Sequence, residues 1–100
     1  MSYYKLVRDR IPEIIEAQGR ESVNHIADDE EFQKALMNKL REEVEEFIEE
    51  PCREEMADIM EVIYAILKNQ EFTFEEIEEV RKKKAKERGV FDKKIIAFIE

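Results

Sequence analysis

Four acidic side chains stand at the spacing that suits a divalent cation held between two helices. Glu43 and Glu46 lie three residues apart in LREEVEEF, and Glu55 and Asp58 lie three residues apart in REEMADIM. Helical residues at this spacing have their Cβ atoms about 5–6 Å apart and share one face. The two pairs can therefore serve one metal site if consecutive helices bring them together.

Position around each helix distinguishes these four residues from the other acids. Spacing alone is weak evidence, because the chain has 26 acidic residues. At about 100° per residue, Glu43 falls inside the apolar arc of its helix and Glu46 falls at the edge of that arc. Glu55 and Asp58 fall within the apolar stripe of the next helix. The neighbouring Glu42 points to the opposite face.

Carboxylates that converge on a half-apolar groove repel one another and lose hydration, which raises their pKa values. A divalent cation removes this conflict, and all-oxygen ligands suit Mg²⁺, with Mn²⁺ as an alternative. Because Mg²⁺ commonly shares its coordination shell with substrate phosphates, phosphoryl chemistry is the first expectation. The competing interpretation is that these acids reach solvent or pair with lysines of a neighbouring element.

The helix signals predict an all-α fold, a small bundle of about four helices in a single domain over residues 1–100. Proline suits the first turn of a helix, glycine its end, and Asp or Thr its N-cap. Residues 23–27 are β-prone, and the tail at residues 92–100 fits a helix or a strand that would pair with them. The predicted helices run from Pro12 to Gly19, from Asp28 or Asp29 to about Glu50, from beyond Pro51 to about Asn69, and from Thr73 to Gly89.

Composition limits the classes of partner. Charged residues and hydrophobic residues each make up 43% of the chain, as expected for amphipathic helices with a charged back. A chain of 100 residues has room for few core layers, so we expect a homodimer or homotetramer that buries leftover apolar surface. The net charge of −9 disfavours nucleic acid and anionic lipid as partners. With no signal-peptide or membrane-spanning pattern, we expect a cytoplasmic protein.

The acidic motifs resemble those of the all-α nucleoside triphosphate pyrophosphohydrolases, the superfamily of MazG and phosphoribosyl-ATP pyrophosphohydrolase. The family carries E-x-x-E on one helix and E-x-x-D on the next, with magnesium between them. The opening KLVRDRIPEII and the ending ERGVFDKKI are also similar to one branch of this superfamily. The resemblance implies Mg²⁺ ligation by Glu43, Glu46, Glu55 and Asp58.

Basic residues near both ends of the chain are candidate phosphate ligands. Lys84 and Arg88 lie one turn apart and can neutralise phosphates, as cations do in phosphoryl transfer. The alternative is a solvated helix end that complements the helix dipole. The resemblance implies that Lys5 and Arg8 contribute to the substrate site, whereas the alternative is an exposed ion pair or cap.

Together these features predict Mg²⁺-dependent hydrolysis of a (deoxy)nucleoside triphosphate to a monophosphate and pyrophosphate, in nucleotide-pool housecleaning. Glu43 and Glu46 are the candidate catalytic residues, with Glu46 as a possible acceptor of the water proton. Phosphoribosyl-ATP is the less favoured substrate, because Arg41 stands where the histidine-pathway enzymes carry glycine. The alternative from another class is a non-catalytic helical interaction module.

Overall fold

The computed structural model describes residues 3–100, which form four α-helices and no β-strand. The helices are α1 (Ile11–Ala17), α2 (Asp29–Glu49), α3 (Arg53–Asn69) and α4 (Phe74–Arg88). The predicted all-α fold is confirmed. Within the described residues, no helix combines the length and apolar character that crossing a membrane requires.

Local sequence signals set the helix ends. The Asp28 side chain caps α2 by accepting a hydrogen bond from the Glu31 backbone N–H at 2.9 Å. Thr73 caps α4 in a capping box with Glu76, which satisfies two backbone N–H groups at once. Gly89 follows α4 with φ +85°, a left-handed conformation that side chains with a Cβ disfavour. The predicted starts and ends are accurate to within a few residues.

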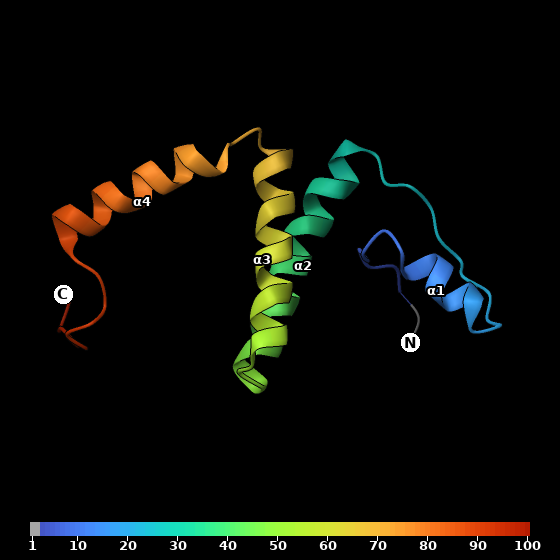
Figure 1. Cartoon of the computed structure of the whole chain (residues 1–100), viewed down its shortest axis with the longest axis horizontal. Helices are drawn as coiled ribbons and strands as arrows, with labels where there is room; N and C mark the ends of the chain where they lie inside the picture. The colour runs from blue at the N-terminus through green and yellow to red at the C-terminus, as the bar shows by residue number, and fades with distance from the viewer. Residues whose placement is uncertain (1–2) are drawn as a thin grey trace.

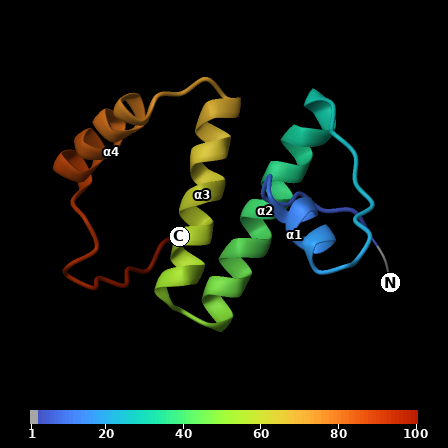
Figure 2. The same ribbon diagram turned by 45° about the vertical axis from the view of Figure 1, so that its right-hand side comes forward.

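The centre of the structure is an antiparallel hairpin of α2 and α3, joined by a short connection that contains Pro51 (Figures 1 and 2). Its interior is small. Among residues 3–100, the buried hydrophobic side chains are Leu36, which is 1% exposed, and Val62, which is 8% exposed. The hairpin therefore positions side chains along its seam but encloses little core.

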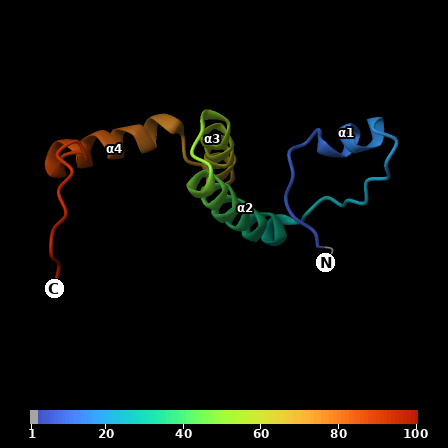
Figure 3. The same cartoon turned by 90° about the horizontal axis from the view of Figure 1, so that it is seen from below.

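The other two helices flank the hairpin on opposite sides. Seen from below, α1 extends to one side and α4 to the other (Figure 3). Residues 3–10 form an N-terminal arm that leads into α1.

The β-strand alternative for residues 23–27 and the C-terminal tail is wrong, because neither segment forms a strand. The two segments lie on opposite sides of the hairpin (Figure 1), so neither can give the other a ladder partner. A single β-prone segment does not form a stable strand without such a partner.

Candidate metal centre

The hairpin brings three of the four predicted metal ligands together. Glu43 of α2 and Glu55 and Asp58 of α3 each offer a carboxylate oxygen, and these oxygens all lie within 4.8 Å of one another. The antiparallel pairing causes this meeting, because the last turns of α2 lie beside the first turns of α3. We call these three residues the acid cluster.

Two oxygens of the acid cluster lack partners. Within the described part of the chain, Oε2 of Glu43 and Oε2 of Glu55 are buried and accept no hydrogen bond. Glu43 is only 6% exposed. A buried acceptor without a partner costs about 1–3 kcal/mol, and more when it is charged. A hard divalent cation would satisfy both oxygens, so the donor set fits Mg²⁺ or Mn²⁺.

Lys39 compensates part of the charge on Glu43. Its Nζ lies 3.1 Å from Glu43 Oε1, one turn earlier on α2, and its side chain is 17% exposed. Burial raises the pKa of the Glu43 carboxyl, the negative charges of Glu46 and Asp58 raise it further, and Lys39 opposes both effects. The Glu43 carboxyl therefore binds its proton more readily than a solvated glutamate does.

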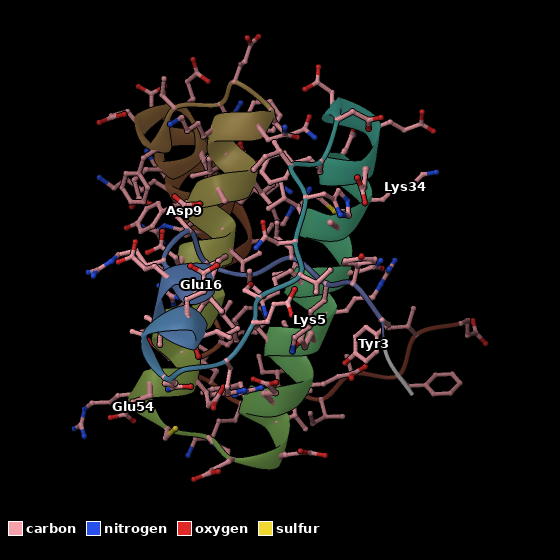
Figure 4. The ribbon with its side chains drawn as sticks, turned by 90° about the vertical axis from the view of Figure 1, so that its right-hand side faces the viewer. Tyr3, Lys5, Asp9, Glu16, Lys34 and Glu54 are labelled. Atoms are coloured by element: carbon pink, nitrogen blue, oxygen red, sulfur yellow. The ribbon has the colours of Figure 1, made fainter. Side chains whose placement is uncertain are left out.

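The N-terminal arm supplies a second cation. Arg8 donates from Nη2 to Asp58 Oδ1 at 2.7 Å, and its Nη1 lies 3.9 Å from Glu61 Oε1. Lys5 donates to Glu42 Oε1 at 2.9 Å, and this bond raises the pKa of the Lys5 ammonium. Viewed from the side of the arm, Lys5 lies in front of α2, and Asp9 lies on the α3 side (Figure 4). Two ion pairs therefore fasten the arm across the hairpin.

A cavity of about 390 Å³ lies between this arm and the hairpin. Arm residues 6–9 form one wall, and the opposite walls combine apolar side chains such as Phe32 and Val62 with Lys39, Glu43 and Asp58. Its volume is within the range of small-ligand sites, which pair an apolar lining with a few polar groups. Two cluster acids and the Arg8 guanidinium thus face one space.

The remaining predicted site residues lie elsewhere. Glu46 is half-buried on α2 and falls outside the group of three, although its charge acts on Glu43. Lys84 and Arg88 are exposed on α4, which extends away from the hairpin (Figure 1). Within one chain the structure therefore does not bring these two cations to the acid cluster.

Lys39 is a site residue that the acidic motifs do not reveal. Its signal in the sequence is its position four residues before Glu43, because side chains at this spacing are neighbours on a helix. The pairing of Arg8 with Asp58 has no local signal, since 50 residues separate the partners. It depends on the path of the arm across the hairpin.

Comparison with known proteins finds similarity over part of the chain. No family model matches the chain, and no solved structure matches it. The chain is 55% identical over 42 residues to an uncharacterized protein of Mycolicibacterium smegmatis. The match covers 42% of this chain and 43% of that protein, which is less than half of the relative's length. The acid cluster is therefore the feature of the molecule from which a function can be inferred.

Proposed function

We propose that the chain is a Mg²⁺-dependent hydrolase that converts a nucleoside triphosphate to a monophosphate and pyrophosphate. The observation that carries this proposal is the pair of buried, unpartnered oxygens on Glu43 and Glu55, within a cluster that Asp58 completes. The similarity of the acidic motifs and of both chain ends to the MazG-type pyrophosphohydrolases supports the same reaction.

In this proposal Glu43, Glu55 and Asp58 hold the cation, and Glu46 is a further candidate ligand on the same face of α2. A bound Mg²⁺ supplies positive charge to phosphate oxygens and favours ionisation of water. The reaction adds a water oxygen to the α-phosphorus, breaks the bond from that phosphorus to the bridging oxygen, and releases pyrophosphate. Glu46 is the candidate acceptor of the water proton.

The cations of the cavity have a complementary role. Arg8 is on the wall opposite the hairpin, and its planar guanidinium suits bidentate contact with phosphate oxygens. Lys39 holds Glu43 in place through a contact of 3.1 Å. The apolar part of the lining, including Phe32 and Val62, suits a nucleoside. One cavity thus offers surfaces for both ends of a nucleotide.

The rival interpretation is an interaction module in which the acids only form ion pairs. Two ion pairs favour the interaction module, because Arg8 contacts Asp58 and Lys39 contacts Glu43. It gives no role to the unpartnered oxygens of Glu43 and Glu55, which a purely structural cluster would be expected to satisfy. We therefore favour the metal-dependent hydrolase.

The test is turnover of a panel of nucleoside triphosphates with Mg²⁺, with the products resolved by ion-exchange chromatography. We expect monophosphate and pyrophosphate, not diphosphate and phosphate. Glu55→Gln and Asp58→Asn should abolish turnover and weaken binding of Mn²⁺ alone, while helix content stays unchanged. Glu54→Gln is the matched control, because Glu54 is exposed and next to Glu55. Full activity in both cluster variants would refute the site.

A further inference from the structure

The Arg8 guanidinium lies beside two acids of α3. Its Nη2 lies 2.7 Å from Asp58 Oδ1, and its Nη1 lies 3.9 Å from Glu61 Oε1. Asp58 and Glu61 are three residues apart on α3, so their side chains are neighbours on one face of the helix. The contact with Asp58 is a direct hydrogen bond, whereas the contact with Glu61 is an ion pair beyond hydrogen-bond distance. Arg8 therefore has a second carboxylate next to the one that it binds.

The two acids differ in their relation to the candidate metal centre. Asp58 belongs to the acid cluster, whereas Glu61 falls outside it. The Glu61 side chain is 61% exposed, against 38% for Asp58. Both acids line the cavity, as Arg8 does. A cation bound by the acid cluster therefore competes with Arg8 for Asp58 and leaves Glu61 available to the guanidinium.

Contacts away from Asp58 hold the N-terminal arm on the hairpin. Lys5 donates to Glu42 of α2 at 2.9 Å (Lys5 is labelled in Figure 4). The Arg8 carbonyl accepts a hydrogen bond from the Ile11 N–H at 3.0 Å, at the start of α1. A shift of the guanidinium by about 1 Å brings Nη1 within hydrogen-bond distance of Glu61. The change of partner therefore needs a movement of one side chain and not of the arm.

We propose, on the basis of the proposed function, that Glu61 is a positioning residue that holds the Arg8 guanidinium once a divalent cation has bound Asp58. Arginine has five N–H donors, so a contact from Nη1 to Glu61 leaves the donors released by Asp58 for phosphate oxygens. Without Glu61, the released side chain is solvated and has to be ordered when nucleotide binds. Glu61 therefore keeps Arg8 in the cavity between cation binding and nucleotide binding.

The first experiment is calorimetric titration of the full chain with Mn²⁺ alone, in a double-mutant cycle of Arg8→Gln and Glu61→Gln. In the presence of Arg8, we expect Glu61→Gln to weaken Mn²⁺ binding about twofold to fivefold, because the cation then displaces an arginine that has lost its alternative partner. In the Arg8→Gln background, Glu61→Gln should have a clearly smaller effect. Equal weakening in both backgrounds would be a general effect of charge and would overturn the inference, as would unchanged or tighter binding in the presence of Arg8.

Steady-state turnover of a nucleoside triphosphate gives a second readout. Glu61→Gln should raise KM about threefold to tenfold, the effect of ordering one side chain, and leave kcat within about twofold of the unmodified chain. Glu61→Asp retains the carboxylate and should restore part of the loss. Glu54→Gln is the matched control, because it removes the same charge from an exposed position of α3 and should leave KM unchanged. A fall in kcat at unchanged KM would contradict a role in holding Arg8.

The hydrolase and the role of Glu61 fail in different ways. If the unmodified chain binds no Mn²⁺, the acid cluster is not a metal site and both are refuted. If Arg8 and Glu61 are coupled in Mn²⁺ binding but no triphosphate is turned over, the hydrolase is refuted and the role of Glu61 stands. If turnover occurs and the two residues are not coupled, the role of Glu61 alone is refuted.

Discussion

Arg8 Nη2 lies 2.7 Å from Asp58 Oδ1, so a side chain of the protein already forms an ion pair with one of the three acids that we propose as metal ligands. The pair joins the N-terminal arm to α3 across 50 residues of sequence. A divalent cation and the Arg8 guanidinium therefore compete for the same carboxylate. This relationship links metal binding to the position of the arm.

Replacing Arg8 should strengthen the binding of a divalent cation in the absence of nucleotide. The Arg8 and Asp58 side chains are 55% and 38% exposed, and exposed pairs contribute at most about 1 kcal/mol. We expect Arg8→Gln to bind Mn²⁺ up to about fivefold more tightly, measured by calorimetry, and to bind nucleotide more weakly. Arg10→Gln is the control, because Arg10 pairs with Glu13 outside the cluster. Weaker Mn²⁺ binding in Arg8→Gln would contradict the competition.

Glu43 should give the metal-free protein a pH-dependent component of stability. Burial raises the pKa of its carboxyl, so the folded state binds this proton more tightly than the unfolded state does. The contribution is complete below the unfolded pKa, near 4.5, and is lost as the pH rises through the folded pKa. In the presence of a chelator, the stability of Glu43→Gln should therefore lack this pH dependence. At neutral pH its free energy of unfolding should exceed that of the unmodified chain by on the order of 1 kcal/mol.

The measurement is urea unfolding at a series of pH values, with and without Mg²⁺. In the unmodified chain Mg²⁺ should restore at neutral pH the stability lost to ionisation of Glu43. The same Mg²⁺ should have little effect on Glu43→Gln. Parallel pH profiles for the two proteins in chelator would show that Glu43 titrates as a solvated acid.

Lys39→Met should destabilise the metal-free protein and increase its response to Mg²⁺. The substitution leaves the nearly buried Glu43 without its cation, at an expected cost of about 1–3 kcal/mol. Differential scanning fluorimetry with and without Mg²⁺ measures both effects. Lys34→Met is the matched control, because Lys34 is 76% exposed and its one ion pair among residues 3–100 is with Glu30. Equal Mg²⁺ responses in the two variants would remove Lys39 from the site.

Thr73→Ala should loosen α4 alone. The substitution removes the capping box with Glu76, which costs about 1 kcal/mol of helix stability. Because the hairpin does not enclose α4, we expect faster amide exchange within residues 74–88 and little change in α2 or α3. Thr73→Ser retains the hydroxyl and should behave like the unmodified chain. Faster exchange across the whole molecule would mean that α4 is packed in the assembly.

The helices and the acid cluster were largely predictable because their causes are local. Capping residues fixed the starts of α2 and α4. Helical angles placed Glu43, Glu55 and Asp58 on facing surfaces, but they also placed Glu46 there, and Glu46 lies outside the group of three. The β-strand alternative failed because a strand needs a partner that residues 23–27 do not meet. The Arg8–Asp58 pair joins residues 50 positions apart, with α1 and α2 between them, and no local pattern specifies such a contact.

The basic end of α4 provides the sharpest test of the substrate site. At about 100° per residue, Arg88 and Lys84 point within about 20° of Ile77, whereas Lys83 points about 120° away from it. If these two cations reach phosphate in the assembled protein, Arg88→Gln should raise KM about tenfold, the size of one charge-assisted hydrogen bond. Lys83→Gln should leave KM unchanged, and neither variant should alter Mn²⁺ binding, since α4 extends away from the acid cluster. Equal KM values for the two variants would favour the alternative interpretation, in which the basic residues form a solvated helix end that complements the helix dipole.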